Sequence, residues 1–334
     1  MDVSEIGEFG LIERLTEALG AASDSRLVVG IGDDAAVWRT GEAAYTIATT
    51  DTMVAGVHFL PGRVAWRDVG WKTLAVNVSD IAAMGGMPTF ALVTLCLPPE
   101  TAAEDVDALY AGLRECAETY GVTIAGGDVV SAPVFSVTVA LMGEAAVSET
   151  GEPLLLRRDA ARVGDAIAVT GPLGGSAGGL RALVERTAGE HPGLVEAHMR
   201  PRARVDAGAA AVCAGVRCGI DISDGLVQDL RHICEASGVG AEVRVDDVPL
   251  FAGLEEAFGA DESRTMALTG GEDYELLLVA PEEVLRATGL SLHAIGRVVE
   301  DADRLVRVAN AGGGEIAIET PGWDHLQRRG EPRS

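Results

Sequence analysis

The sequence predicts a two-domain protein of the α/β class, with α+β as the broader description. Its 334 residues are enough for two domains of about 150 residues each. Short apolar runs of strand length alternate with segments in which apolar residues recur at the spacing of amphipathic helices. The polar run at 148–153 is the best candidate boundary. We therefore expect domains at 1–150 and 151–334.

The N-terminal half is predicted to begin with an amphipathic helix over 5–20. A tight glycine turn at 30–37 follows, and a strand over 44–48 then ends in hydroxyl residues and Asp51. Residues 64–84 are predicted to be helical, because alanines dominate their second half and glycines and a proline follow. The remaining elements expected in this half are a strand over 90–97, the clearest helix over 101–120, a short strand over 122–125 running into a glycine turn at 126–128, and a strand over 134–141.

The C-terminal half opens with a buried strand that ends near Gly171, and the glycine-rich stretch 171–179 leads into a helix. Such a loop can cradle phosphate at a helix N-terminus, but close helix packing is the stronger alternative here. A strand through Asp221 precedes the next helix, and the turn 270–271 leads acidic residues into a buried strand. Three further strands are expected at 292–299, 304–309 and 315–318.

Composition restricts the classes of function. Hydrophobic residues make up 48% of the chain and aromatic residues only 4%, which predicts a mostly aliphatic core. The net charge of −25 argues against nucleic acid or an anionic membrane as a partner. The chain has a single lysine, Lys72, and no Walker A sequence, which excludes a P-loop nucleotide-binding protein. Any phosphate ligand would need metal ions and scattered arginines.

The five cysteines form no C-x-x-C pair, and their odd number favours buried free thiols in a reducing compartment. The N-terminus is acidic where a signal peptide would be basic, and no apolar run approaches the length of a membrane span. We therefore expect a soluble cytoplasmic protein.

Carboxylates recur where strands end or helices begin, most of them beside glycine or hydroxyl residues. These carboxylates belong to Asp33, Asp51, Asp80, Asp128, Asp221 and Asp224. Ligand sites of α/β folds gather at such positions, and so many like charges are tolerable together only with cations bound. Several Mg²⁺ ions in an aspartate-rich site are typical of phosphoryl transfer.

Each motif also has a simpler interpretation. A Gly-Asp-Asp triplet is most often an acidic surface turn. Ser223 or Asp224 could cap the following helix, although three polar side chains in four residues exceed what a cap needs. His58 follows Asp51 by seven residues, and substrate contact and core packing are equally good interpretations of it.

Taken together, the motifs resemble those of thiamine-monophosphate kinases. The matching segments are GIGDDAA at 30–36, TDTMVAGVHF at 50–59, NVSDIAAMG at 77–85, GGD at 126–128, DISDGL at 221–226 and GGEDYEL at 270–276. The resemblance runs in order from about residue 7 to residue 326. It implies ATP-dependent phosphorylation of thiamine monophosphate to thiamine diphosphate, the last step in making that cofactor.

The resemblance also implies the fold of aminoimidazole ribonucleotide synthetase, the PurM-like fold. There the N-terminal domain forms a β-barrel across a homodimer interface, and a C-terminal α/β domain packs behind it. ATP would be the co-substrate and several Mg²⁺ ions would be bound.

Site residues carry over from the resemblance by motif. Mg²⁺ would be held by Asp33, Thr49, Thr50, Asp51, Asp80, Asp128, Asp221 and Asp224. ATP would be contacted by Tyr110, Gly127, Asp128, Arg158 and Ser223, with Arg157 as an alternative to Arg158. Thiamine monophosphate would be contacted by His58, Glu272 and Trp323.

A phosphate acceptor is already ionised near neutral pH, because its second pKa is about 6. No general base or covalent nucleophile is then required, and Asp51 and Asp128 would act through Mg²⁺. One alternative is another ATP-using enzyme of the same fold, such as a selenophosphate synthetase, aminoimidazole ribonucleotide synthetase or hydrogenase maturation factor. Neither the reactive cysteine nor the lysine of a selenophosphate synthetase precedes Lys72. The other alternative is a non-catalytic, Mg²⁺-binding dimeric scaffold.

Overall fold

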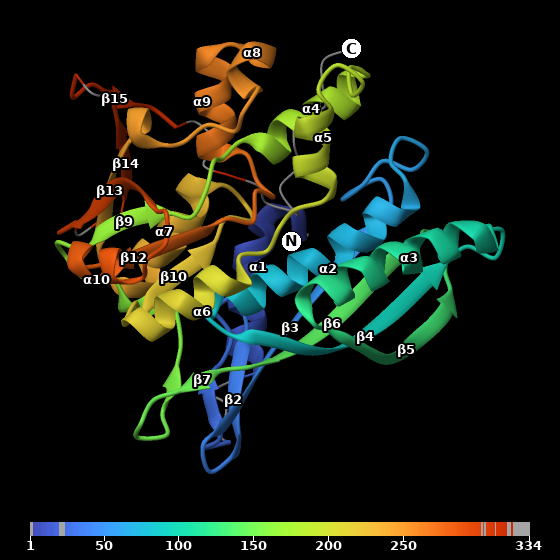
Figure 1. Cartoon of the computed structure of the whole chain (residues 1–334), viewed down its shortest axis with the longest axis horizontal. Coiled ribbons are helices and arrows are strands. Elements are labelled where there is room, and N and C mark those ends of the chain that lie inside the picture. Colours follow the sequence, from blue (N-terminus) through green and yellow to red (C-terminus); the bar gives the residue numbers. More distant parts are fainter. Residues whose placement is uncertain are drawn as a thin grey trace.

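The computed structural model describes residues 3–19, 24–301, 303, 305–310, 312–318 and 322. Two mixed β-sheets lie beside each other; helices cover one face of the first sheet and both faces of the second (Figure 1). The first sheet has the strand order β1-β2-β3-β6-β4-β5 and the second β10-β12-β9-β13-β11-β14-β15. A short hairpin of β7 (Ala146–Val147) and β8 (Pro153–Leu154) lies in the chain between them. The boundary at residue 150 stays a prediction.

The first sheet is antiparallel except for its last pair, β4 and β5, which run parallel. Its strands are β1 (Leu27–Val29), β2 (Ala36–Gly41), β3 (Ala44–Val54), β4 (Met87–Leu97), β5 (Thr123–Ser131) and β6 (Ser136–Glu144). The helices of this half are α1 (Val3–Leu19), α2 (Trp66–Ala83) and α3 (Ala103–Tyr120). Strands β1 and β2 were not predicted from the sequence.

A predicted strand end and a predicted turn in this half are wrong. Strand β3 continues to Val54, so the hydroxyl residues 49–52 lie inside the strand rather than after it. Strand β5 runs through Gly127 and Asp128 instead of turning at 126–128. At Gly127 an added Cβ would lie 1.7 Å from the carbonyl oxygen of Val93. This glycine therefore permits close strand pairing, not a turn.

The second sheet belongs to the C-terminal half of the chain and carries helices on both of its faces. Its strands are β9 (Ala166–Val169), β10 (Cys218–Asp221), β11 (Gly240–Arg244), β12 (Leu276–Ala280), β13 (His293–Val299), β14 (Val306–Ala309) and β15 (Glu315–Ile316). The helices are α4 (Gly175–Glu185), α5 (Pro192–Met199), α6 (Val205–Ala214), α7 (Leu226–Ser237), α8 (Leu254–Phe258), α9 (Ala260–Thr269) and α10 (Glu282–Ala287), with short 3₁₀ turns η1 (Arg158–Ala160) and η2 (Val245–Asp247). The three predicted C-terminal strands are confirmed as β13 to β15.

Helix α2 is the element on which both halves meet. It packs against β3, β6 and α3 of the first half and against α6 and β10 of the second. Glycines allow the closest of these contacts: a Cβ at Gly112 of α3 would lie 1.7 Å from the carbonyl oxygen of Arg67, and a Cβ at Gly70 would lie 1.9 Å from that of Leu109. Because almost every side of α2 is covered, a polar group that it carries can be buried deeply.

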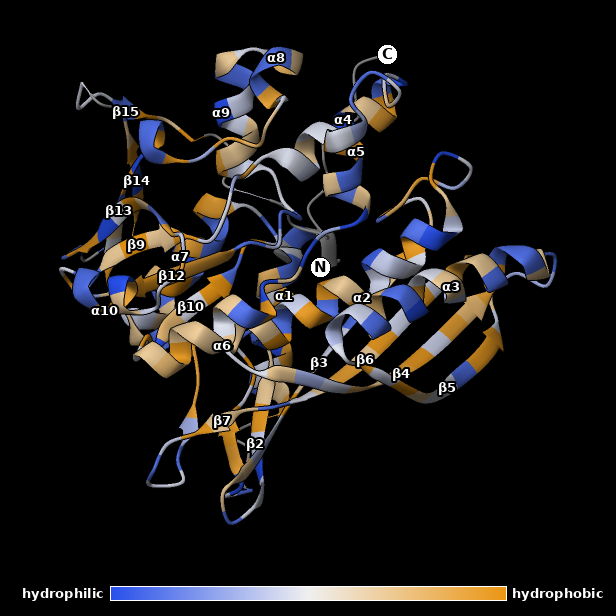
Figure 2. Ribbon diagram, viewed as in Figure 1, coloured by the Kyte–Doolittle hydropathy of each residue, from blue (hydrophilic) through white to orange (hydrophobic). Residues whose placement is uncertain are grey.

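The core is mostly aliphatic, as predicted, with a small aromatic cluster of Phe59, Trp66 and Phe135. Hydrophobic residues concentrate on the strands of both sheets (Figure 2). All five cysteines are free thiols; Cys116, Cys218 and Cys234 are buried and Cys213 is exposed. Among the described helices, none has the length and apolar character that crossing a membrane would require.

Candidate active site

Three carboxylates from distant parts of the chain converge beside α2. Each of Asp34, Asp80 and Asp221 places an oxygen within 4.8 Å of the others. Asp34 lies in the loop before β2, Asp80 on the last turns of α2, and Asp221 at the end of β10. The hydroxyl of Thr49 donates to Asp80 Oδ2 at 2.5 Å, and that of Ser79 donates to Asp221 Oδ2 at 2.5 Å. The convergence that the sequence predicted for Asp80 and Asp221 is confirmed.

Burial makes this cluster hold protons when no cation is present. Desolvation raises the pKa of all three carboxyl groups, and repulsion from neighbouring carboxylates, Asp51 included, raises the pKa of Asp80 and Asp221 further. The pKa of Asp221 rises to about 8. Without a bound cation the cluster is therefore partly protonated near neutral pH, and a bound cation would displace those protons.

Arg158 is the cation that faces the cluster. Its Nη2 lies 2.5 Å from Asp34 Oδ1, and its Nε lies 3.9 Å from Asp33 Oδ1. Arg157 turns away and pairs with Asp159 at the surface. Of the two adjacent arginines, Arg158 is thus the one directed toward the site.

The loop at 30–37 contributes Asp34 to the cluster, whereas the sequence analysis chose Asp33. The Asp33 side chain lies beside the cluster: it accepts the Asp34 backbone N–H at 3.0 Å and the Arg158 backbone N–H at 3.4 Å. Burial and the neighbouring Asp34 raise the pKa of Asp33 to about 6. Sequence alone could not choose between adjacent aspartates, because the turn decides which one points inward. Metal binding by Asp33 stays a prediction.

The donor set fits Mg²⁺. Asp34 Oδ2 is buried and has no hydrogen-bond partner in the described part of the chain. Three carboxylates against one arginine leave the cluster short of positive charge, and hard carboxylate oxygens are the ligands that Mg²⁺ prefers. An orphaned buried oxygen is otherwise costly, so a cation explains a feature that the protein fold alone does not.

Strand β3 sorts the neighbouring residues by face. Side chains alternate along a strand, so Thr49 and Asp51 share one face and Thr50 lies on the other. The Thr50 hydroxyl donates to the carbonyl oxygen of Val139 at 3.0 Å. Its side chain is therefore directed away from Thr49 and Asp80, and a metal-binding role for Thr50 stays a prediction.

Ser223 and Asp224 lie in the loop between β10 and α7, and Asp229 rather than either of them binds the free backbone N–H groups at the start of α7. Asp229 Oδ2 accepts the backbone N–H groups of Ser223, Asp224 and Gly225 at 3.0–3.1 Å. The alternative that Ser223 or Asp224 caps this helix is thus not needed. Asp224, Asp229 and His232 form a second group of possible metal ligands within 4.8 Å. Sequence reasoning missed Asp229, although its place in the first turn of α7 is a signal for such a cap.

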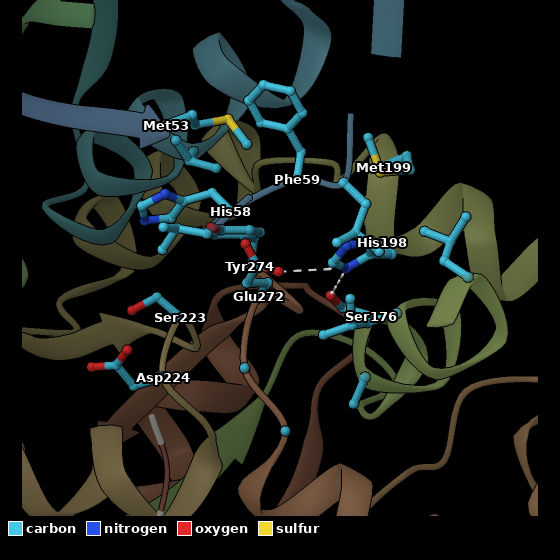
Figure 3. Close-up of a pocket in the computed structure, with 18 of the residues that line it drawn as sticks. Met53, His58, Phe59, Ser176, His198, Met199, Ser223, Asp224, Glu272 and Tyr274 are labelled. Atoms are coloured by element: carbon cyan, nitrogen blue, oxygen red, sulfur yellow. Dashed lines mark hydrogen bonds and ion pairs between the residues drawn. The ribbon is translucent and has the colours of Figure 1, made fainter. Parts of the chain in front are cut away.

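A cavity of about 620 Å³ opens beside the cluster (Figure 3). Its polar wall includes Asp51, Asp80, His58, Ser223, Asp224 and Glu272, which were all predicted site residues. Its apolar wall includes Met53, Phe59, Leu180, Leu183 and Met199. A cavity with carboxylates at one side and aliphatic walls elsewhere suits a ligand that joins a phosphate to an apolar ring system.

His58 and Glu272 are fixed within this wall. The Nδ1 atom of His58 accepts the backbone N–H of Val54 at 3.0 Å, which leaves the Nε2 side of the ring as the proton donor. Glu272 pairs with Lys72 of α2 at 2.9 Å and lies 3.4 Å from His198 Nδ1. Lys72 and His198 were not predicted as site residues from the sequence. The one sign in the sequence that pointed to Lys72 as a site residue was that it is the only lysine in the chain.

Three predicted ATP contacts lie apart from this cavity in a single chain. Asp128 and Gly127 are exposed on the edge strand β5, and Tyr110 is exposed on α3. Thr52, Thr138, Thr94 and Asp128 stand in one row across β3, β6, β4 and β5. Three strand spacings separate the ends of this row, about 14 Å. Asp128 is therefore not part of the group that Asp34, Asp80 and Asp221 form in one chain, and its roles in metal and ATP binding stay predictions. Trp323 lies outside the described residues.

The glycine-rich stretch 171–179 packs closely and does not present a free cradle. The carboxylate of Asp273 accepts the backbone N–H groups of Gly174 at 2.6 Å and Ser176 at 3.1 Å. A Cβ at Gly179 would lie 2.1 Å from the carbonyl oxygen of Leu194. The packing alternative stated for this stretch is confirmed.

Stability of the metal-free protein is expected to fall as the pH rises from about 4 to 8. An unfolded aspartate has a pKa of about 3.9, so over this range the native cluster keeps protons that the unfolded chain releases. Each pKa unit of difference corresponds to about 1.4 kcal/mol of unfolding free energy, or a few degrees of Tm for a chain of this size. Thermal melts of chelator-treated protein would measure this.

Added Mg²⁺ should restore the lost stability at pH 8 and have a much smaller effect at pH 5, where it competes with protons. An equal gain in Tm at both pH values would contradict ion binding at raised-pKa carboxylates. The same melts in added NaCl serve as the control for ionic strength.

Comparisons with known proteins show the family and the fold of the chain. Residues 32–145 match the model of the AIR synthase related protein N-terminal domain, and residues 162–308 match that of the C-terminal domain. The chain is 34% identical over 336 residues to a thiamine-monophosphate kinase of Aquifex aeolicus, covering 98% of this chain and 100% of that one. It is 39% identical over 302 residues to a thiamine-monophosphate kinase of Methanopyrus kandleri, covering 89% and 91% of the two chains.

A solved structure described as AaThiL complexed with AMPPCP and TMP superposes with a TM-score of 0.85 at 34% identity, over 97% of this chain and 99% of that one. The two-domain α/β fold with mixed sheets is therefore the fold of aminoimidazole ribonucleotide synthetase, as expected. The chain belongs to the thiamine-monophosphate kinase family of AIR synthase-related proteins.

Proposed function

We propose that this protein transfers the γ-phosphoryl group of ATP to thiamine monophosphate, giving thiamine diphosphate and ADP. The observation that carries the proposal is the convergence of Asp34, Asp80 and Asp221 beside a cavity that has both carboxylate and aliphatic walls. Family membership supports the same activity, and a similar structure was solved with AMPPCP and TMP.

The buried carboxylates would hold Mg²⁺, with Asp51 and Asp224 as further ligands from the cavity wall. Bound there, Mg²⁺ would neutralise charge on the phosphoryl groups and help to hold them in line. Arg158 is the positive side chain next to this cluster, and we propose that it contacts ATP. Ser223 offers a hydroxyl at the same wall for the nucleotide.

The chain's own residues position the acceptor. We propose that an oxygen of the thiamine monophosphate phosphate attacks the γ-phosphorus of ATP, and that the bond from that phosphorus to the oxygen of ADP breaks. The acceptor oxygen is already ionised near neutral pH, so the site needs no base. His58 has its proton on the ring nitrogen that is not bonded to Val54, and it can donate to the acceptor phosphate. Incubation with labelled ATP alone should leave no phosphate on the protein.

We infer that the working form is a homodimer in which a second copy supplies Asp128, Gly127 and Tyr110. The last two strands of the first sheet support this. Phe90 and Leu92 of β4 and Val130 of β5 lie on one face of the sheet and are 42–52% exposed, and both strands are largely hydrophobic in Figure 2. Burying this face against a second copy would remove an apolar surface from water and cover an edge strand. A barrel spanning the two copies is the expected form of that interface.

Mixing two inactive variants tests whether Asp128 acts across the dimer. We expect Asp51→Asn and Asp128→Asn each to be nearly inactive, because each lacks one carboxylate of the complete site. After dissociation and re-association together, half of the dimers should be mixed, and each mixed dimer should contain one intact site. Activity should then recover to about a quarter of wild type, given equal re-association.

No recovery, with both variants dimeric by light scattering, would place Asp128 in the same chain's site or outside the site. Full activity of Asp51→Asn alone would remove the metal-binding role proposed for Asp51.

The reaction itself is tested by following thiamine diphosphate and ADP with purified protein. Thiamine monophosphate should give both products in equal amounts, whereas the substrates of selenophosphate synthetase and aminoimidazole ribonucleotide synthetase should give no turnover of ATP. Turnover with either of those substrates, and none with thiamine monophosphate, would overturn the proposal.

A further inference from the structure

The single lysine of the chain is buried behind the cavity. Lys72 lies on α2, its side chain is fully buried, and its Nζ atom lies 2.9 Å from Glu272 Oε2. The contact is an ion pair without the alignment of a hydrogen bond. Lys72 does not line the cavity, whereas Glu272 does. A buried ammonium is costly unless it is paired, so its placement requires a reason, and Glu272 is the partner that the structure provides.

His198 of α5 approaches the same carboxylate oxygen. Its side chain is buried, and its Nδ1 atom lies 3.4 Å from Glu272 Oε2 and 2.9 Å from the hydroxyl of Ser176 (Figure 3). Burial and the positive charge of Lys72 lower the pKa of His198 to about 3, so the ring is neutral. The contacts of Glu272 with Lys72 and His198 both fall on Oε2. These two residues therefore leave Oε1 to a ligand.

The backbone also fixes Glu272. Its φ of 66° is in the left-handed region, which non-glycine residues rarely adopt. Its N–H donates to the carbonyl oxygen of Ser223 at 2.7 Å, and the next residue, Asp273, is held by the N-terminus of α4. Strain of this kind persists where the surroundings determine the conformation, and it is common at ligand sites.

We propose that Lys72 and His198 are positioning residues that hold Glu272 as a hydrogen-bond acceptor for the exocyclic amine of the substrate's aminopyrimidine ring. The inference rests on the proposed function and deepens it. Lys72 neutralises the charge of Glu272, and His198 is neutral, so the group as a whole has little net charge. Such a group selects a ligand by hydrogen-bond donation rather than by attraction to the positive thiazolium ring. The structure thus assigns substrate selectivity to Lys72, which lies behind the cavity wall, and to His198, which is part of that wall.

The test compares thiamine monophosphate with oxythiamine monophosphate, in which a carbonyl replaces the exocyclic amine. The wild type should strongly prefer the amine, because a site built around an acceptor rejects a ligand that lacks the donor. Lys72→Met should raise the KM for thiamine monophosphate about tenfold and reduce the preference by a similar factor. Its kcat and its KM for ATP should stay within about threefold of wild type.

Three further variants separate positioning from folding. The double variant Lys72→Met/Glu272→Gln removes both buried charges, so its Tm should be closer to wild type than that of Lys72→Met. Its preference for the amine should nevertheless stay low, because a glutamine amide can donate to the carbonyl of the analogue. His198→Gln should shift the KM in the same direction by a smaller factor, whereas His191→Gln, at the start of α5, should not shift it.

The outcomes are distinguishable. If the wild type does not phosphorylate thiamine monophosphate, the proposed function fails. If the wild type is active and Lys72→Met keeps its KM and its preference, the positioning role alone fails. If Lys72→Met does not fold, the double variant and His198→Gln decide: wild-type preference in both would overturn the inference, and reduced preference in both would support it.

Discussion

Replacing Asp80 by asparagine is expected to lower kcat/KM by at least about three orders of magnitude while raising the Tm of the metal-free protein. Asp80 lies between the other carboxylates, and its pKa is raised by burial first and then by Asp51, Asp221 and Asp34. An amide of the same shape removes that repulsion. It also removes a metal ligand that the proposed reaction requires, so activity and stability should change in opposite directions.

Kinetics with thiamine monophosphate and melts with and without Mg²⁺ would measure both effects. The Mg²⁺-dependent gain in Tm should shrink in Asp80→Asn, because one ligand is missing. Asp107→Asn, an exposed position on α3, is the matched control and should change neither quantity. A lower Tm together with lost activity would mean that Asp80 is a structural residue, bonded to Thr49, rather than part of a charge cluster.

The local elements of this fold were largely predictable because their signals are local. Helix α3 shows regular apolar spacing and ends at Gly121 in a left-handed conformation, as a C-terminal glycine should. Helix α2 was recognised from its alanines and its closing glycines, and it does present Asp80. Such patterns depend only on neighbouring residues, which a sequence displays directly.

The positions that sequence reasoning missed depend on distant parts of the chain. Glycines at 126 and 127 suggested a turn, yet β5 continues because β4 approaches it closely. Lys72 stood out in the sequence only as the single lysine. Its burial depends on the elements that cover nearly every side of α2, and its partner Glu272 comes from a segment 200 residues away. The choice of Asp34 over Asp33 likewise depends on Arg158. Motif spacing identifies the site's carboxylates, but it does not show how side chains are directed or which chain supplies Asp128.

Two glycine-to-alanine substitutions, both inside helices, are expected to have opposite effects on stability. At Gly112 of α3 an added methyl group would lie 1.7 Å from the Arg67 carbonyl oxygen, so α2 and α3 would have to separate. We expect a loss of at least about 3 kcal/mol of unfolding free energy, the upper range for overpacking, because the clash is with backbone. At Gly193 of α5 nothing lies within 4 Å of the added Cβ, and the gain in helix propensity should stabilise the protein by about 0.5–1 kcal/mol.

The effect at Gly112 should extend to the active site, because the helix that it displaces carries Lys72 and Asp80. Urea unfolding of both variants, with activity measured on the folded fraction, would separate the two consequences. Gly112→Ala should lose activity even where it remains folded, since a shift of α2 moves one metal ligand relative to Asp34 and Asp221. Wild-type activity in folded Gly112→Ala would mean that the site tolerates displacement of α2, and the carboxylate cluster would then owe its geometry to β10 and the loop before β2 alone.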